Sequence, residues 1–427
     1  MVQGAAISYL QKEKKEGKTM NKKRGKFFLV IMAFFTTLLL FADNGFSYKK
    51  TVPETRAYEN EKTEINQVET YITDYGQYGQ NLAGSAGCWW PKGSANAYVY
   101  GAGIWIAGLS SNGDTVCVNG YNTVGSGEEF IPGPWQHNQD HLNDPQSHPE
   151  DRLYVSTNPE DFAVWPLVDS TGKKIVLGDQ DTWCFFNSHE ASKQCAPDTV
   201  TIPLTVTRHT FSWTQPLLEN MLFFEYIIEN TDIAGTDTLK NMYVGFGSDL
   251  DVGNADDDLV GVERFNRQWS LGYTYSPTQE IGWDALPPYY IGFRFLQGPR
   301  ADDTVRVGQD TLNPDTLIMA GERIPLTTFK KFTRDVDVSI DRERFLAMAG
   351  YDFTVSPPVY NPFGDSFDVD PSDKRIAMSS GPFILAPGEA DTIAYVMLFS
   401  NGNTGGLLFL KQEALVAKRF YSIFRSP

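Results

Sequence analysis

The chain has few of the residues on which thiol and metal-centred catalysis depend. Its 427 residues include four cysteines and five histidines. No two cysteines are spaced as C-x-x-C, which argues against thiol redox catalysis and against a zinc site built from thiolates. The G-x-S-x-G, H-E-x-x-H, P-loop and strand-linked G-x-G-x-x-G patterns are also missing. Glycosidase carboxylates pair in space rather than in sequence, so a glycoside hydrolase is not excluded by the lack of a motif.

Long apolar runs are also scarce, and the one at Phe27–Ala42 has a distinctive setting. A basic stretch at residues 22–26 precedes it, Met20 lies just upstream, and the small-x-small sequence Gly45-Phe46-Ser47 follows it. This is the layout of a secretory signal peptide. The run is shorter than the roughly 20 residues of a membrane span, which favours a cleaved signal over a retained N-terminal anchor. We therefore predict a signal peptide over residues 1–47, with the true start at Met20.

Basic residues are few beyond this segment. Without residues 1–50, which hold ten Lys/Arg and three Asp/Glu, the chain keeps 26 basic and 50 acidic residues, a formal charge of −24. Such a chain repels phosphate backbones, so nucleic acid is a poor partner. We expect a secreted, extracellular or cell-surface protein with no membrane contact beyond the signal segment.

All four cysteines lie downstream of the signal, at Cys88, Cys117, Cys184 and Cys195. An even number in an oxidising compartment predicts two disulfides. Pairing between sequence neighbours, Cys88 with Cys117 and Cys184 with Cys195, is the preferred connectivity of the three that are possible. Free, buried thiols are the alternative.

The pattern along the chain is that of a β protein. Residues 48–70 are polar and predict a linker. From Tyr71 onward the chain is rich in Gly, aromatic and β-branched residues, and apolar residues alternate in short runs, which is typical of strands. Seven such runs predict strands: 200–206, Leu222–Ile228, Leu239–Phe246, Tyr98–Ala107, Tyr289–Leu296, Pro382–Leu385 and Thr392–Phe399.

One helix is predicted, at the end of the chain. Leu410, Ala414, Ala417, Tyr421 and Phe424 are spaced 4, 3, 4 and 3, which makes one apolar stripe that would pack on the sheet. We therefore predict a mainly β fold, an antiparallel β-sandwich-like architecture with a C-terminal α-helix. It would comprise a β-rich region at 71–199 and a sandwich-like region at 200–427, or a single domain.

Four segments carry a resemblance to a known group of proteins: YGQYGQNLAGSAGCWWPKGSANAYVYGAGIWIAG, FFEYIIENTDIAGTDTLKNMYVGFGSDLDVGNADDDLVG, YYIGFRFLQGP and DKRIAMSSGPFILAPGEADTIAYVMLFSNG. With them, most of residues 71–422 resembles the β-rich N-terminal region of large secreted bacterial proteins that usually carry immunoglobulin-like modules and a type IX-style C-terminal sorting domain. The resemblance implies a secreted or surface-attached protein and implies no reaction. It does not extend to a sorting domain, because the chain stops at Pro427. A truncated reading frame or a shorter relative released outside the cell would account for this.

The segment DLDVGNADDD at residues 249–258 is the strongest candidate site. It places five carboxylates and one amide within ten residues after a strand. Calcium takes six to eight oxygen ligands, and a bound cation would relieve the repulsion among these charges. The segment is not an EF-hand, because its glycine falls at position five and Val260 replaces the glutamate at position twelve. We predict a structural calcium site, with a solvated acidic turn as the alternative. The predicted ligands are Asp249, Asp251, Asn254, Asp256 and Asp258.

Three further groups of residues are weaker candidates. The acidic residues Asp365, Asp368, Asp370 and Asp373 are loosely spaced and predict a surface loop. His137, His141 and His148 lie in a segment rich in Pro, Asn and Asp, which predicts a polar loop rather than a metal site. Aromatic residues can stack on sugar rings, but they also dominate the cores of sandwiches. The tryptophans considered are Trp89, Trp90, Trp105, Trp135 and Trp183, of which Trp105 is predicted to be core.

The sequence thus predicts a secreted or cell-surface structural or adhesive β-protein, stabilised by calcium and without an identified catalytic activity. Its partners would be cell-envelope components or glycans. The alternative is a carbohydrate-binding module or a glycoside hydrolase. A binding or catalytic protein should have an open cleft lined by tryptophans and carboxylates, whereas a structural protein should have its aromatic residues buried.

Overall fold

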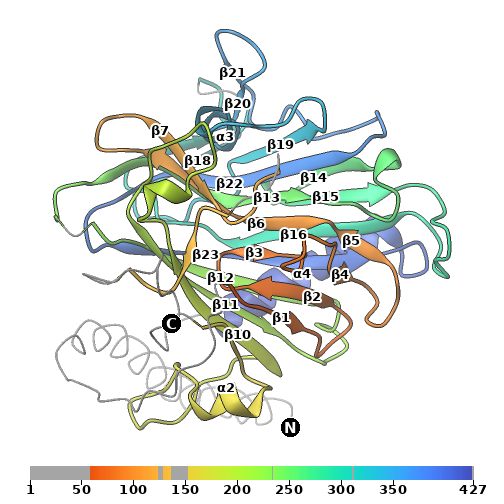
Figure 1. The fold of residues 1–427 in the computed structure, drawn as a ribbon. Coiled ribbons are helices and arrows are strands. Elements are labelled where there is room, and N and C mark those ends of the chain that lie inside the picture. Colours follow the sequence, from red (N-terminus) through yellow and green to blue (C-terminus); the bar gives the residue numbers. More distant parts are fainter. Residues whose placement is uncertain (1–57, 124–127, 136–151, 233, 310–311, 426–427) are drawn as a thin grey trace, which may run out of the picture.

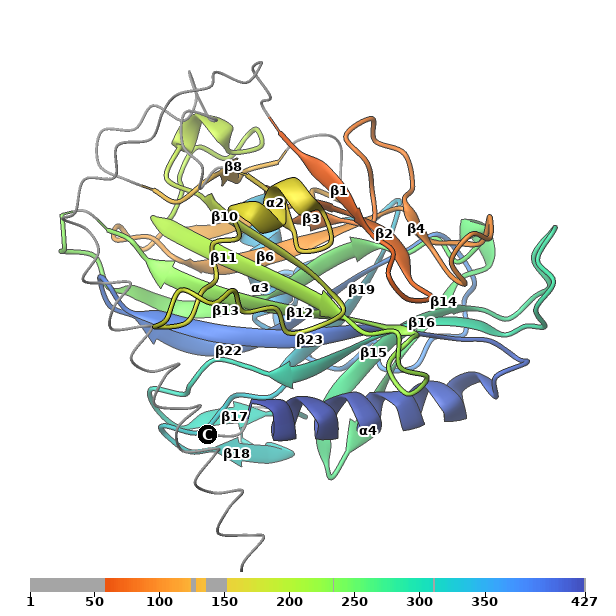
Figure 2. The same ribbon diagram turned by 90° about the horizontal axis from the view of Figure 1, so that it is seen from below.

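The computed structural model describes residues 58–427, except 124–127, 136–151, 233, 310–311 and 426–427. Within these residues, two large antiparallel sheets lie face to face (Figures 1 and 2). The predicted fold class, a mainly β sandwich-like architecture with a C-terminal helix, is confirmed.

The first sheet has ten strands. Eight of them form a continuous path in the order β19 (Thr328–Thr333), β22 (Lys374–Leu385), β13 (Leu239–Asp249), β6 (Gly101–Leu109), β3 (Gln77–Tyr78), β2 (Glu69–Thr73), β4 (Cys88–Trp89) and β5 (Ala97–Val99). The other two are attached at the side: β1 (Asn60–Thr63) pairs with β2, and β7 (Thr115–Asn119) pairs with β6.

The second sheet has nine strands. Its path is β14 (Leu259–Phe265), β15 (Gln268–Ser276), β16 (Tyr289–Gln297), β23 (Ala390–Ser400), β12 (Met221–Asn230), β11 (Leu204–Ser212), β10 (Gln180–Asn187) and β8 (Ile131–Pro132), with β9 (Tyr154–Val155) on β10. Two hairpins stand apart: β17 (Val305–Val307) with β18 (Thr316–Ile318), and β20 (Tyr351–Asp352) with β21 (Val359–Tyr360). Short helical segments are α2 (Pro159–Ala163), η2 (Ala191–Lys193) and η3 (Ala255–Asp257).

The core between the sheets follows from the alternation along the strands. In β23, Ile393, Tyr395, Met397 and Phe399 face the interior and belong to the main apolar core, as the spacing predicts. The residues between them, Ala394, Val396 and Leu398, belong to a second apolar cluster on the outer face. This central strand is therefore apolar on both faces, and its outer face needs a cover.

Helix α4 (Gly406–Phe424) provides that cover. Figure 2 shows it lying along the second sheet, and its Leu410, Ala414, Ala417 and Tyr421 join the outer cluster. The predicted apolar stripe is thus confirmed for these four residues. Helix α3 (Asp341–Met348) covers the outer face of the first sheet in the same way, where Trp105 is completely buried. The molecule therefore has four layers: helix, sheet, sheet and helix.

The prediction of a linker over residues 48–70 is wrong for the second half of that segment. Asn60–Thr63 forms β1, and β2 begins at Glu69; the two strands pair along Asn60↔Thr73 to Thr63↔Thr70. The polar composition misled the prediction because this hairpin lies at the margin of the first sheet. Residues at such a margin need few apolar side chains. The regions 71–199 and 200–427 share both sheets, since β6 pairs with β13 and β10 pairs with β11.

The predicted signal peptide lies outside the described residues, and so does its apolar run Phe27–Ala42. Among the helices of the described chain, none combines the length and the apolar character that crossing a membrane requires.

Both predicted disulfides are wrong, since all four cysteines are free. Cys88 faces the core between the sheets, whereas Cys117 lies on the opposite face of the first sheet, with its Sγ 3.8 Å from Met348 Sδ. A disulfide needs Cβ atoms about 3.5–4.5 Å apart, which a sheet between them prevents. Cys184 also faces the core, while Cys195 lies in the loop after η2, where its backbone N–H donates to Glu129 Oε1 at 2.9 Å.

We expect all four thiols to be reduced and slow to react in the folded protein. Burial raises the pKa of Cys88 to about 12 and the pKa values of Cys184 and Cys195 to about 11, so little thiolate forms near neutral pH. Titration with a thiol reagent should find four thiols in guanidinium without reductant. Dithiothreitol should leave the melting temperature unchanged. A count of two or none in denaturant would contradict the free-thiol structure.

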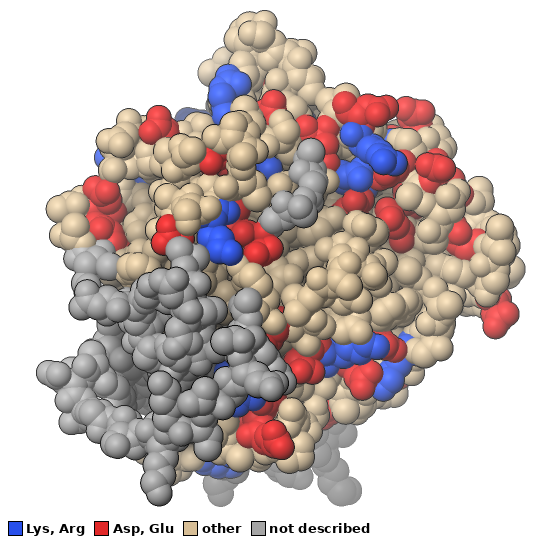
Figure 3. Space-filling view, in the orientation of Figure 1, with Lys and Arg blue, Asp and Glu red and all other residues tan. Residues whose placement is uncertain are grey.

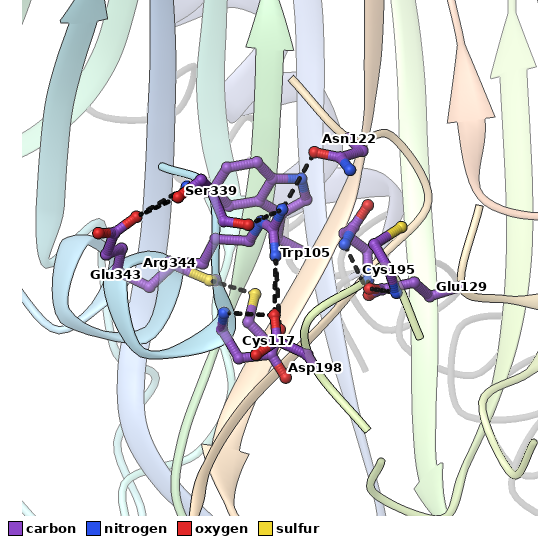
Figure 4. Close-up of polar contacts among 12 residues, drawn as sticks. Trp105, Cys117, Asn122, Glu129, Cys195, Asp198, Ser339, Glu343 and Arg344 are labelled. Carbon is purple, nitrogen blue, oxygen red and sulfur yellow. Dashed lines mark hydrogen bonds and ion pairs between the residues drawn. The ribbon is translucent and has the colours of Figure 1, made fainter. Parts of the chain in front are cut away.

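Helix α3 is fixed to the first sheet by a buried arginine, Arg344 (Figure 4). Its Nη2 donates to Asn122 Oδ1 at 3.0 Å and to the Ser339 carbonyl at 3.3 Å. Its Nη1 lies 3.5 Å from Asp341 Oδ1 and 3.7 Å from Asp198 Oδ2. The guanidinium thus joins the helix to two loops that are distant in sequence.

Candidate functional site

The acidic segment 249–258 begins at the last residue of β13 and continues through the short helix η3. Gly253 adopts a φ of +74°, a left-handed conformation that favours glycine, and a side chain there would also run into Glu280. The Glu280 carboxylate holds the turn, because it accepts from the Asn254 backbone N–H at 3.0 Å and from Ser276 Oγ at 2.8 Å. The loop is therefore shaped by its contacts with Glu280, in the segment that follows strand β15.

Three carboxylates meet where this loop leaves the sheet. Oxygen atoms of Asp249, Asp251 and Asp373 all lie within 4.8 Å of one another. Asp373 immediately precedes β22, and β22 pairs with β13 so that Arg375 is opposite Asp249. The antiparallel pairing therefore places Asp373, just before the start of β22, next to Asp249 and Asp251 at the end of β13.

Arg375 lies among these carboxylates. Its Nη2 is 3.1 Å from Asp249 Oδ2, its Nη1 is 2.8 Å from Asp373 Oδ1, and its Nε is 3.1 Å from Asp337 Oδ2. With Asp251, four carboxylates thus surround a single guanidinium. If all were ionised, the group would carry three uncompensated negative charges.

The excess of negative charge raises the proton affinity of the cluster. Burial, reinforced by the neighbouring carboxylate of Asp251, raises the pKa of Asp249 to about 8. Burial and the charge of Asp373 raise the pKa of Asp251 to about 6. Asp249 Oδ1 is buried without a hydrogen-bond partner, and the side chain of Asp249 is only 7% exposed. Arg375 is the positive partner of this group, but its single charge does not balance the buried carboxylates.

The structure brings together two of the five predicted ligands, Asp249 and Asp251. Asn254 and Asp256 are exposed. Asp258 is buried but serves the loop itself, since its Oδ2 accepts from the Val252 backbone N–H at 3.2 Å. The third member of the cluster, Asp373, was assigned by the sequence to a separate surface loop.

Two other acidic residues of that second group, Asp365 and Asp368, are paired with lysines. The side chain of Asp368 is fully buried and contacts Lys331, and its Oδ2 lies 3.5 Å from Lys374 Nζ. Asp365 Oδ2 lies 3.2 Å from Lys330 Nζ. The prediction of a surface loop is therefore wrong for Asp368. Its ion pairs fix the approach to β22, and so position Asp373.

The weaker candidates divide into two cases. His137, His141 and His148 lie outside the described residues. All nine tryptophans of the chain are described and none is exposed: Trp90 and Trp105 are buried, as predicted for Trp105, and Trp89, Trp135 and Trp183 are half-buried. Trp135 stacks on His189 with the ring centroids 4.4 Å apart. Charged side chains of both signs are interspersed on the face of the molecule in Figure 3.

No family model matches the chain, and no curated protein matches it. Among solved structures, the GalM/aldose epimerase homologue from C. elegans is similar at 10% sequence identity, over 81% of this chain and 99% of that chain, with a TM-score of 0.27. A likeness this distant identifies no family and carries no argument about activity.

The raised pKa values predict how the cation-free protein responds to pH. Because Asp251 binds its proton more tightly in the folded state than in the unfolded chain, whose reference pKa is 3.8, stability falls as pH rises from about 4 to about 6. Asn cannot titrate, so Asp251→Asn should gain in melting temperature relative to the wild type as pH rises from 4.5 to 8 in EDTA. A difference that stays constant with pH would contradict a repulsive, buried carboxylate.

Proposed function

We propose that this protein is a non-catalytic β-sandwich building block that works outside the cytoplasm and is stabilised by a divalent cation, calcium. The observation that carries the proposal is the group formed by Asp249, Asp251 and Asp373. Oxygen ligands are those that calcium prefers, and a double positive charge would offset most of the excess negative charge around Arg375. The signal-like segment at residues 20–47 supports a location outside the cell.

The burial of the tryptophans supports a structural role over sugar binding. A carbohydrate platform presents exposed rings, and none of the nine tryptophans is exposed. Instead, rings fill the space between the sheets: Tyr395 stacks on Phe224 with centroids 5.0 Å apart, and Trp90 stacks on Phe399 with centroids 5.8 Å apart. This packing is what a rigid module for the cell surface requires.

The role of the cation would be to fix the junction between β13 and β22. Asp249 ends one strand, Asp373 precedes the other, and Asp251 belongs to the loop that leads to the second sheet at β14. A cation held by all three would connect the two sheets at this end of the sandwich. Asp337, which contacts Arg375, lies just before helix α3 and would be held through the same charge group.

We expect calcium to raise the stability of the protein measurably. A site that binds only the folded state contributes about 2.7 kcal/mol when calcium is 100-fold above its dissociation constant. The measurement is the melting temperature in EDTA and in millimolar calcium, for the wild type, Asp251→Asn and Asp373→Asn. Both variants should lose most of the increase.

The matched control is Asp256→Asn, which removes an exposed carboxylate of the same loop outside the cluster. It should keep the calcium response. If calcium gave no shift in the wild type, the cluster would be an acidic turn stabilised by Arg375 alone. An equal loss in Asp256→Asn would point to non-specific attraction by the loop as a whole.

A further inference from the structure

A pocket of about 490 Å³ lies on the outer side of the second sheet, beside helix α4. It is formed by the ends of β15 and β16, by the segment 323–326 and by one side of α4. Its walls include four basic residues and no acidic residue: Arg294, Arg323, Lys418 and Arg419. This composition is unusual in a chain with 53 acidic and 36 basic residues.

Arg294 is the central feature of the pocket. It lies on the face of β16 that turns toward α4, and only 5% of the residue is exposed. Its Nε and Nη1 are buried without a hydrogen-bond partner, and no described carboxylate forms an ion pair with it. The guanidinium lies over the ring of Phe265, 4.1 Å from the centroid. Burial lowers the pKa of Arg294 to about 10, so the group is charged at neutral pH.

An unpaired buried arginine is costly to keep, because a guanidinium loses its hydration without gaining a counter-ion. The other buried arginines of the described chain differ in this respect. Arg344 and Arg375 have aspartates beside them, and Arg208 donates to the carbonyls of Thr73 and Gln77. Of these four buried arginines, Arg294 is the one without a carboxylate or carbonyl partner, and it lines a pocket where a ligand could supply one.

Two further donors lie in the same pocket. Ser270 Oγ is buried without a partner, at a point where the pairing of β14 with β15 shifts register. Such irregularities re-aim side chains and are frequent beside binding sites. The Lys418 ammonium donates to the Leu296 carbonyl, and an ammonium has three N–H donors in all. Burial lowers the pKa of Lys418, and the charge of Arg294 adds to this effect.

The remaining basic residues contribute less. Arg323 is already paired with Asp391, and Arg419 is exposed. The uncompensated positive charge of the pocket therefore belongs to Arg294 and Lys418. Apolar side chains, including Phe265 and Leu415, complete the walls. A cavity of this size and mixture is typical of sites for small organic molecules.

We propose that this pocket binds a small organic anion, whose carboxylate, sulfate or phosphate group pairs with Arg294 and lies near Lys418 and Ser270. The planar guanidinium suits two parallel hydrogen bonds to such oxyanions. The body of the ligand would lie between Phe265 and α4. The site is separate from the carboxylate cluster and does not depend on the cation.

The test compares the purified wild type with Arg294→Met by thermal shift and by isothermal calorimetry. The probes are sodium glucuronate, sulfate and phosphate at constant ionic strength, with chloride as the reference anion. In the wild type at least one probe should bind, and in Arg294→Met its dissociation constant should rise at least tenfold. Without a probe, Arg294→Met should melt no lower than the wild type, because it loses no ion pair. The identity of the probe that binds would distinguish a carboxylate site from a sulfate or phosphate site.

Arg342→Met is the matched control, since Arg342 is exposed on α3 and does not line the pocket. It should bind the probe as the wild type does. Should Arg294→Met fail to fold, Lys418→Met makes the same comparison with a half-buried residue. The proposal is overturned if no probe binds more tightly than chloride, or if removal of Arg294 or Lys418 leaves the binding unchanged.

Discussion

Replacement of Arg344 by alanine is expected to lower the free energy of unfolding by about 3–5 kcal/mol, the usual cost of breaking a buried ion pair from one side. The variant would leave Asp341 buried without its cation, although its side chain is only 4% exposed. Burial and the nearby charges of Glu129 and Asp198 already raise the pKa of Asp341 to about 8. The Asn122 side chain and the Ser339 carbonyl would lose their donor as well.

Chemical denaturation of the two proteins at pH 7 measures this loss directly. Arg342→Ala is the control, because Arg342 belongs to the same helix but is exposed, and its effect should stay within about 0.5 kcal/mol. Loss of the guanidinium raises the pKa of Asp341 further above 8, so the deficit of Arg344→Ala relative to the wild type should grow as pH rises above about 8. A loss below about 1 kcal/mol, with no dependence on pH, would show that the guanidinium does not hold α3 to the sheet.

Replacement of Leu410 by alanine is expected to cost about 2–5 kcal/mol, as for other buried leucines. Leu410 is fully buried between α4 and the second sheet. Below it, Gly292 of β16 has no side chain, and a Cβ placed there would lie 2.9 Å from Leu410 Cδ2. Leu410 therefore fills the hollow over this glycine, and shortening it leaves a cavity that the rigid sheet cannot close.

Leu408 offers a matched control two residues away, since it is 67% exposed. Leu408→Ala should change the free energy of unfolding by less than about 0.5 kcal/mol. The double variant Gly292→Ala with Leu410→Ala should be less destabilised than the sum of the two single variants, because the added methyl group occupies the space that the leucine leaves. Strict additivity would mean that the two residues do not share one cavity.

The fold class could be predicted from the sequence because many strands keep a strict alternation. Ile393 to Phe399 and Leu222 to Ile228 each place every second residue in the core, as predicted. The helix was visible from a stripe of apolar residues for the same reason. The alternation fails at the sheet margin, where β1 is polar, and at 200–206, where Val200 is partly exposed and the strand β11 begins only at Leu204.

The candidate cation site could be predicted only in part. Asp249 and Asp251 are close in sequence, so the high density of acidic residues in this segment could be recognised from the sequence. Asp373 joins them through the pairing of β13 with β22, and no sequence pattern specifies which of many strands will be neighbours. The same limit applies to Arg294, which looked like one polar residue in an apolar strand. Its lack of a counter-ion depends on what α4 and the segment 323–326 bring near it.

The order of strands has a consequence for how this chain can fold. Strand β23 lies between β16 and β12, and β22 lies between β19 and β13, so each sheet receives an interior strand from the last part of the sequence. Neither sheet can close until residues 374–400 have left the ribosome. Contacts between residues so far apart in sequence also form slowly. Both sheets should therefore form only after these residues have been synthesised.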